Sequence, residues 1–465
     1  MIDAALILLR LLLGLGSIFL VGYGVFALLV PNLREFSGLE QLSLSFGLGA
    51  TLLTLWMLLL TWLGHPFGLF LILVPLLALA GAALLVKRIF RRRDLTLKTS
   101  VLSPAPSPPT PYTLWDWVFL GLLAAFFLFA TLRAVLYPMW AWDAIATWGC
   151  KAKIFYQSRG LNLTCIDAHN YYPNLVPLLL SYLYFCLGRV NDHLAQGLFP
   201  LWGAMLLALL YSFLKRMGLR RTPALGVTTF FALNGTVFLV HLYIAYADLP
   251  LAYFCLAGAG LLYLWLKDAA PKGGLLLTAA FFAGLAWCKY EGPPLAGTII
   301  LAAALTLIWL KPPDLKGRLL KLSLPILGLA VGYLPWRLFA TLRHLEMGAD
   351  HVQGFYPQQF LEAAYYLLHA LVNPLLFGVF WPALVLALIF SGRSLWRSPR
   401  LFLVLFLGGN LLAILIAYGV APTSPEEFAG YVRNTLDRLL LHITPVAVLL
   451  IGEEVKEVGR GPGGR

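Results

Sequence analysis

The sequence predicts an all-α polytopic membrane protein with about thirteen transmembrane helices. Of its 465 residues, 60% are hydrophobic and only 12% are charged, and the mean hydropathy is +0.82. A water-soluble domain of this length needs far more polar surface. The predicted spans are the apolar runs 4–31, 41–63, 66–86, 115–138, 191–214, 222–242, 249–267, 274–290, 292–310, 322–340, 371–391, 401–420 and 436–452.

The distribution of Lys and Arg predicts the orientation of these helices. Basic residues gather in alternate loops, at 87–98, 215–221, 267–272, 311–321 and 393–400. Such loops stay on the cytoplasmic side, so the intervening loops are predicted to face outward. We expect the chain to lie in the cytoplasmic (inner) membrane of a bacterium or archaeon. The formal net charge of +13 is spread over short loops, so membrane topology explains it better than nucleic-acid binding.

A Pro- and Ser-rich segment between the third and fourth runs predicts a semi-extended linker. It separates an N-terminal three-helix transmembrane unit, residues 1–90, from the rest of the chain. We assign 91–113 to a basic and Pro/Ser-rich cytoplasmic linker, 114–452 to a transmembrane core and 453–465 to a cytoplasmic tail.

Two outward loops are long, 139–190 and 341–370, and they concentrate His, Trp, Tyr and carboxylate residues. Aromatic residues also form belts in ordinary membrane proteins, but the mixture of polar and aromatic chemistry on one side favours a functional site there. In the first of these loops, 144–158 has the spacing of an amphipathic interfacial helix. The apolar run 176–187 is too short to span a membrane and predicts a second juxtamembrane helix.

The strongest single candidate is Asp143, which lies among Trp140, Trp142 and Trp148 directly after an apolar run. An ionisable group at the end of a membrane helix costs free energy to hold, so a functional role is favoured. Asp248 fits both a site and a helix N-cap followed by proline.

Other charged residues have competing interpretations. Glu291 is also explained as an acidic residue in the first turn of a helix. Lys289 is also explained as a lysine whose side chain extends to the membrane interface. Arg438 lies inside an apolar run, which favours a function or an ion pair with Asp437 or Asp248.

Several of these segments, taken in order, resemble the GT-C superfamily of integral membrane glycosyltransferases, such as the aminoarabinose transferases of lipid A and the protein O-mannosyltransferases. The resemblance begins with the loop aspartate and its two juxtamembrane helices. It continues through Asp248 in 245–254, Lys289 in 284–294 and Arg438 in 437–445. It covers roughly 114–452 and leaves the first three helices outside.

The resemblance implies an inverting glycosyltransferase with a GT-C-like core. It would move a sugar from a polyprenyl-phosphate-linked donor to a glycan, lipid or protein acceptor on the outward face. Catalysis falls to Asp143 as base together with Asp248. The donor phosphate is expected on Lys289, Arg438, Arg433 and Arg337. Substrate contacts are expected from Trp142, Lys151, Lys153, His169, Tyr172, Glu291 and His351, and the segment 341–370 matches a mobile lid.

A transporter or flippase for a lipid-linked sugar is the main alternative, and a non-catalytic assembly subunit is a third. A transporter places ionisable residues near the bilayer midplane, whereas here they lie at the outer ends of the runs. No cofactor is assigned, although the outward carboxylates and histidines leave a divalent cation open. A disulfide between Cys150 and Cys165 is left open as well.

Overall fold

The computed structural model describes residues 2–97, 111–164, 166, 168–345 and 354–458, and over these residues it contains helices and no strand. The α-helices are α1 (Ile2–Leu29), α2 (Gly38–Trp62), α3 (Leu69–Leu97), α4 (Leu114–Leu136), α5 (Cys150–Ser158), α6 (Leu175–Leu187), α7 (Asp192–Ala195), α8 (Leu198–Arg216), α9 (Arg221–Leu233), α10 (Val237–His241), α11 (Asp248–Leu266), α12 (Gly274–Cys288), α13 (Gly292–Leu310), α14 (Leu315–Lys321), α15 (Ser323–Leu342), α16 (Pro357–Val372), α17 (Pro374–Phe377), α18 (Phe380–Ser391), α19 (Arg400–Gly419) and α20 (Pro425–Val458). Short 3₁₀ turns occur at Leu33–Glu35 and Gly392–Arg397, and a π-helical turn at Ala144–Gly149.

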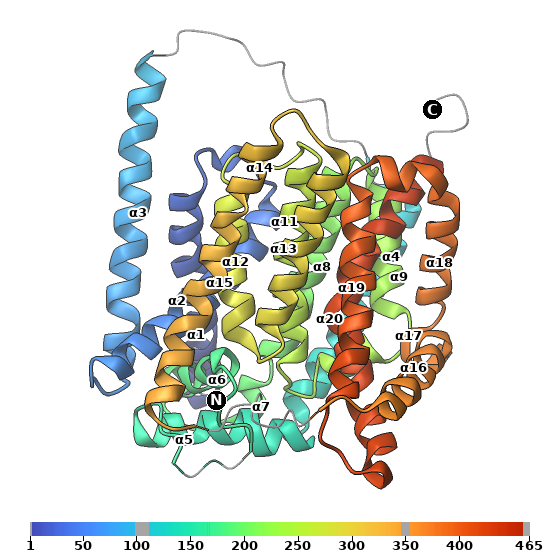
Figure 1. Ribbon diagram of the computed structural model, residues 1–465. Helices are drawn as coiled ribbons and strands as arrows, with labels where there is room; N and C mark the ends of the chain where they lie inside the picture. Colours follow the sequence, from blue (N-terminus) through green and yellow to red (C-terminus); the bar gives the residue numbers. More distant parts are fainter. Residues whose placement is uncertain (1, 98–110, 165, 167, 346–353, 459–465) are drawn as a thin grey trace.

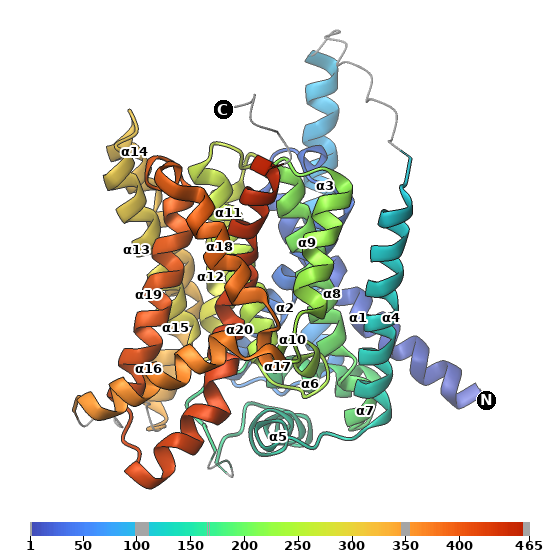
Figure 2. The ribbon, with the colours of Figure 1, turned by 90° about the vertical axis from the view of Figure 1, so that its right-hand side faces the viewer.

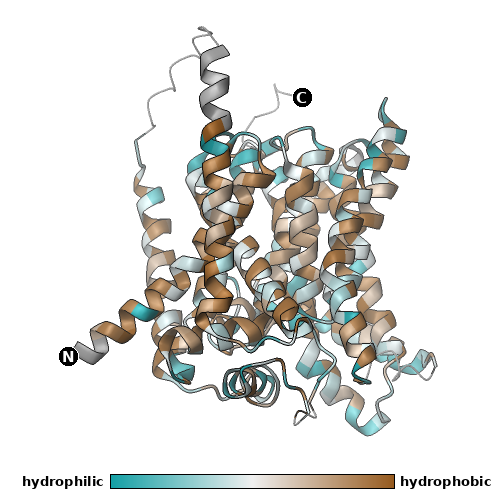
Figure 3. Cartoon of the chain, turned by 90° about the vertical axis from the view of Figure 1, so that its left-hand side faces the viewer, coloured by the Kyte–Doolittle hydropathy of each residue, from teal (hydrophilic) through white to brown (hydrophobic). Residues whose placement is uncertain are grey.

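The bundle is built from helices long enough to cross a membrane. In the described ranges, 10 helical segments have the length and hydropathy of membrane spans. Three shorter apolar helices, α6, α12 and α18, have 13, 15 and 12 residues. Hydrophobic residues fill the middle of the bundle and hydrophilic residues gather toward its two ends (Figure 3). The chain is therefore an all-helical integral membrane protein.

Helices α5, α6, α7 and α16 lie together at one end of the bundle, here called the α5 end, which is the lower end in Figures 1 and 2. Helix α14 and the C-terminal end of α20 lie at the opposite end, here called the α14 end. The basic loops that the described chain includes belong to the α14 end. At that end Lys267 pairs with the buried Glu453, and Arg400 bonds Glu454 at 2.8 Å.

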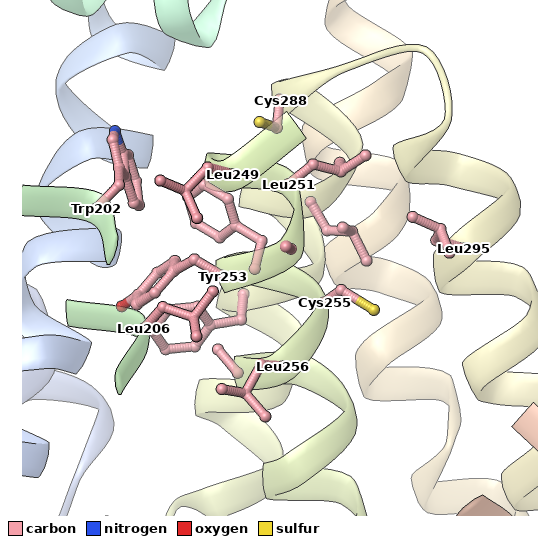
Figure 4. Close-up of a cluster of buried hydrophobic side chains, with 14 of the residues drawn as sticks. Trp202, Leu206, Leu249, Leu251, Tyr253, Cys255, Leu256, Cys288 and Leu295 are labelled. Carbon is pink, nitrogen blue, oxygen red and sulfur yellow. The ribbon is translucent and has the colours of Figure 1, made fainter. Parts of the chain in front are cut away.

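Helix α11 occupies the centre of the bundle and is almost entirely buried. It packs against α8, α12 and α20. Large side chains of α8, such as Trp202 and Leu206, interlock with side chains of α11, such as Tyr253 (Figure 4). Since lipid is as apolar as leucine, close van der Waals packing of this kind is what holds membrane helices together.

The N-terminal helices pack against the predicted core. Helices α1 and α2 contact α6, α8 and α12, whereas α3 packs on α1 and stands outermost (Figure 1). The hydroxyl of Tyr253 donates to the Ser43 carbonyl at 2.6 Å, and Arg216 pairs with the buried Glu40. Because these contacts join α2 to α11 and α8, the first two helices help to build the bundle. The division of the chain near residue 90 stays a prediction.

Glycine allows α1 and α2 to approach closely. A Cβ atom on Gly22 would lie 1.7 Å from the Ser45 carbonyl oxygen, and one on Gly49 would lie 1.9 Å from the Ile18 carbonyl oxygen. Small residues at such crossings bring membrane helices into direct backbone contact.

The predicted span 191–214 is divided between α7 and α8 by a short turn, and two other predicted spans are interrupted where a glycine has positive φ. The run 222–242 is divided between α9 and α10, and 371–391 is divided around Gly378. Both breaks contain glycine at positive φ, namely Gly235 at 93° and Gly378 at 55°, a conformation that interrupts a helix. The Thr236 amide donates to the Leu375 carbonyl at 2.9 Å, and the Val379 amide donates to the side-chain oxygen of Asn234 at 3.1 Å. The two breaks thus satisfy each other's backbone groups, as an apolar environment requires.

Candidate active site

The first long loop forms the two short helices expected from its sequence. Residues 144–149 make a π-helical turn that continues into α5, and α6 follows at Leu175–Leu187. Asp143 directly precedes the π turn. Turns of this type widen the helix locally and are frequent at functional sites. Helix α5 ends at Ser158 and is followed by Arg159 in a left-handed conformation.

An ion cluster at the α5 end is centred on Asp248, the first residue of α11. One carboxylate oxygen of Asp248, Oδ1, lies 2.8 Å from both Lys289 Nζ and His442 Nε2. The other, Oδ2, accepts from Arg438 Nε and Nη2 at 3.1 Å. The same Nη2 reaches Asp143 Oδ2 at 2.7 Å. The structure therefore brings Asp143, Asp248, Lys289 and Arg438 together, although they lie far apart in the sequence.

Glu291 completes the cluster. Its Oε1 lies 2.8 Å from Lys289 Nζ, so that this lysine bridges two carboxylates. The formal charges are three negative (Asp143, Asp248 and Glu291) and two positive (Lys289 and Arg438), which leaves the cluster at about −1 when His442 is neutral. Lys289 and Arg438 are each already compensated by two carboxylates.

Accessibility separates the carboxylates. The side chain of Asp248 is fully buried, whereas those of Asp143 and Glu291 are 16% and 26% exposed. Both oxygens of Asp248 are occupied by cationic or imidazole donors. Of the two predicted catalytic carboxylates, Asp143 alone is open to a substrate, and Asp248 can only position the groups around it.

The local backbone explains how Lys289 and Glu291 come to face inward. Helix α12 ends at Cys288, Lys289 is extended, and α13 begins with Gly292 followed by two prolines suited to a first turn. Burial lowers the pKa of Lys289, but the Asp248 and Glu291 carboxylates raise it more, and the net direction is upward. Burial likewise raises the pKa of Glu291, and the Lys289 ammonium overrides this to lower it. Both groups are held in their charged forms.

The loop before α11 carries backbone strain next to the cluster. Ala245 has a φ of 58°, which is uncommon for a residue with a Cβ atom. The following Tyr246 places its ring 4.5 Å from the Arg438 guanidinium. A strained residue held beside a packed cation is typical of a preorganised site.

Aromatic rings form a stack beside the ion cluster. The His169 ring stacks on Tyr172 with centroids 4.6 Å apart, and Tyr172 stacks on Tyr290 at 5.8 Å. Burial lowers the pKa of His169 and raises that of Tyr172. Because Tyr290 lies between Lys289 and Glu291 in the chain, this stack joins the loop after α5 to the ion cluster.

Lys151 lies behind this stack and does not face a substrate. Its side chain is fully buried in α5, and its ammonium donates to the His169 carbonyl at 2.6 Å. Burial lowers its pKa to about 7. A second predicted substrate contact, Lys153, is tied to Asp192 at 2.6 Å. Trp142, which directly precedes Asp143, is 75% exposed.

The remaining predicted residues lie outside the ion cluster. Arg433 is on α20, where its guanidinium contacts the Tyr366 hydroxyl at 3.3 Å. Arg337 is on α15 and borders a small cavity with Tyr171 and Tyr290. His351 and Cys165 lie outside the described residues. The expected histidine contact therefore stays a prediction, and a disulfide between Cys150 and Cys165 stays open.

The site also contains residues that the sequence did not single out. His442 contacts Asp248 directly, and its signal was its position four residues after Arg438, on the same face of a helix. Arg133, one turn before the end of α4, lies at the same end of the bundle but outside the ion cluster, and its guanidinium is 3.4 Å from the Tyr137 ring.

The carboxylates do not form a recognisable metal site. In the described part of the chain no group of three or more His, Cys, Asp or Glu side chains is arranged to hold a metal ion. Each cluster carboxylate instead contacts Lys289 or Arg438.

Comparisons of the chain with models of protein families, with curated proteins and with solved structures give no match. The functional interpretation therefore depends on the geometry of the cluster and on the sequence motifs that build it.

Proposed function

We propose that this protein is an inverting glycosyltransferase that takes a sugar from a polyprenyl-phosphate-linked donor. The acceptor is a glycan, lipid or protein at the outward face of a bacterial or archaeal cytoplasmic membrane. The proposal includes a GT-C-like core over 114–452. It also includes about thirteen crossings in the whole chain, counting α12, α18 and the α9–α10 segment as spans beside the long helices. The observation that carries it is the meeting of Asp143 with Asp248, Lys289 and Arg438 at one end of the bundle.

The chemistry follows from which groups a substrate can reach. The acceptor hydroxyl loses its proton to the accessible Asp143 carboxylate as its oxygen attacks the anomeric carbon. The bond between that carbon and the phosphate oxygen breaks, and the lipid phosphate leaves with the electron pair. A single displacement inverts the anomeric configuration.

The buried members of the cluster keep Asp143 in place. Arg438 holds the carboxylate through Nη2, and Asp248 in turn holds Arg438 through two nitrogens. A base fixed in this way needs little reorganisation during the reaction. Asp248 is thus a positioning residue in this proposal.

The position of the cluster favours the transferase over the transporter alternative. Asp248 begins α11, Lys289 and Glu291 lie between α12 and α13, and Asp143 lies between α4 and α5. A transporter site is expected near the middle of the bundle, at discontinuous helices. Here the ionisable residues gather at helix ends.

The decisive experiment uses purified protein in lipid nanodiscs. With a polyprenyl-phosphate sugar donor and an envelope extract as acceptor, Asp143→Asn should lower transfer at least about 100-fold, because the proton acceptor is lost. Glu362→Gln, a carboxylate change at the same end on the exposed side of α16, should transfer sugar like the unsubstituted protein. Undiminished transfer by Asp143→Asn would remove the proposed base. Movement of the lipid-linked sugar across vesicles without a new glycosidic bond would establish the transporter instead.

A further inference from the structure

A second feature at the α5 end is a cavity of about 510 Å³ between α16 and α20. Its polar lining consists of Tyr365, Tyr366, His369, Asn373, Arg433 and Asp437. Asp437 precedes Arg438 in the chain and accepts a hydrogen bond from the Arg438 amide at 2.9 Å. The cavity therefore adjoins the ion cluster along α20 but has its own set of side chains.

Arg433 differs from the cations of the ion cluster in its charge balance. Within the described ranges no carboxylate oxygen lies within 4.0 Å of its guanidinium, and its contacts are with the hydroxyl and ring of Tyr366. Lys289 and Arg438 each touch two carboxylates. Arg433 therefore offers an anion that enters this cavity a guanidinium without an ion pair among the described residues, and a planar guanidinium suits the geometry of phosphate.

Helix α16, which borders this cavity, has features of a helix at a membrane surface. Its exposed face carries Leu361, Leu368 and Val372, while Leu367 and Ala370 on the other face are buried. Figures 1 and 2 show α16 inclined across the α5 end of the bundle. An apolar exposed face on a helix at this position is suited to lie against lipid head groups. The cavity behind it is then where the head of a lipid with a long apolar tail would lie.

We propose that this cavity binds the phosphate group of the lipid carrier, with Arg433 as its cation and Tyr366, His369 and Asn373 as hydrogen-bonding partners. The inference rests on the proposed function and deepens it. It assigns the phosphate to a site beside the ion cluster, not to the already compensated Lys289 and Arg438. The apolar tail would extend past α16 into the bilayer.

Binding of polyprenyl phosphate to purified protein in nanodiscs tests the cavity apart from catalysis. Arg433→Gln should weaken binding about 10- to 100-fold, since charged hydrogen bonds are lost. Arg433→Lys should recover part of it, and Tyr366→Phe should weaken it less. Arg189→Gln, which changes an exposed arginine outside the cavity at the same end, serves as the matched control and should bind normally.

Further ligands identify the source of the phosphate. Polyprenol without phosphate should bind at least about 10-fold more weakly than polyprenyl phosphate. Competition by inorganic phosphate that disappears in Arg433→Gln would support the same cavity for the free ion. Suppose that Arg433→Gln binds polyprenyl phosphate as well as the unsubstituted protein does, and that sugar transfer still occurs. This result would overturn the assignment of the phosphate to the cavity and leave the proposed function standing. If the unsubstituted protein neither binds polyprenyl phosphate nor transfers sugar, the proposed function and the phosphate site are both overturned.

Discussion

The central position of Asp248 leads to a prediction about stability. Asp248→Asn keeps the shape of the side chain but removes the charge that Arg438, Lys289 and His442 share. Removing one partner of a buried ion pair typically costs about 3–5 kcal/mol, because the other charge stays buried without compensation. Each cation here keeps a second carboxylate, Asp143 for Arg438 and Glu291 for Lys289. We therefore expect a loss near the lower limit, about 3 kcal/mol of unfolding free energy.

Equilibrium unfolding in mixed detergent micelles measures this loss. Asp192→Asn is the matched control, since Asp192 lies at the same end and pairs with Lys153 at 2.6 Å through side chains that are 21% and 42% exposed. That pair is screened by water, and its loss should cost less than about 1 kcal/mol. Equal effects of the two substitutions would refute the idea that the cluster is organised around a buried charge. Sugar transfer should fall with Asp248→Asn even under conditions where the protein stays folded, because Arg438 would hold Asp143 less firmly.

Two further predictions concern α5 and the contact between α1 and α2. Lys151 has a pKa of about 7 against an ordinary value of 10.5, so between these values the unfolded chain binds a proton that the folded chain does not. Stability should therefore rise by up to about 2 kcal/mol from pH 7 to 9, and Lys151→Met should remove that part of the pH dependence. Equal unfolding free energies of the unsubstituted protein at the two pH values would contradict this prediction. Gly22→Ala places a Cβ atom 1.7 Å from the Ser45 carbonyl oxygen, whereas Gly16→Ala on the same helix meets no atom within 4 Å. The first should lower the unfolding free energy by more than about 1 kcal/mol and the second by little, and similar losses from both would argue against close packing of α1 on α2.

The apolar runs made the helical membrane architecture predictable, because a span must be long and apolar whatever surrounds it. The breaks after Leu233 and Phe377 were less evident, although Asn234, Gly235 and Gly378 carried the signal. A broken membrane helix needs partners for its backbone, and here each break is the other's partner. Such pairing is a property of the folded bundle and leaves no pattern within either run.

For the candidate site, the sequence indicated which charged residues lie at the ends of membrane helices, where an ionisable side chain costs free energy. The structure shows which of these residues contact one another. The sequence did not reveal that Lys151 is buried. Lys153, two residues later in the same predicted helix, carries the same charge, and its side chain is 42% exposed. His442 was hidden in an apolar run. Its role depends on Asp248, which lies 194 residues away in the chain.

The bonds between the two broken helices also constrain how the bundle can move. Helix α16 leads through Asn373 into α17, and the Leu375 carbonyl accepts from both the amide and the hydroxyl of Thr236. Any tilt of α16 must either carry the segment before α10 with it or break these bonds. Since α10 leads within a few residues to Asp248, movement at the membrane surface is mechanically linked to the ion cluster.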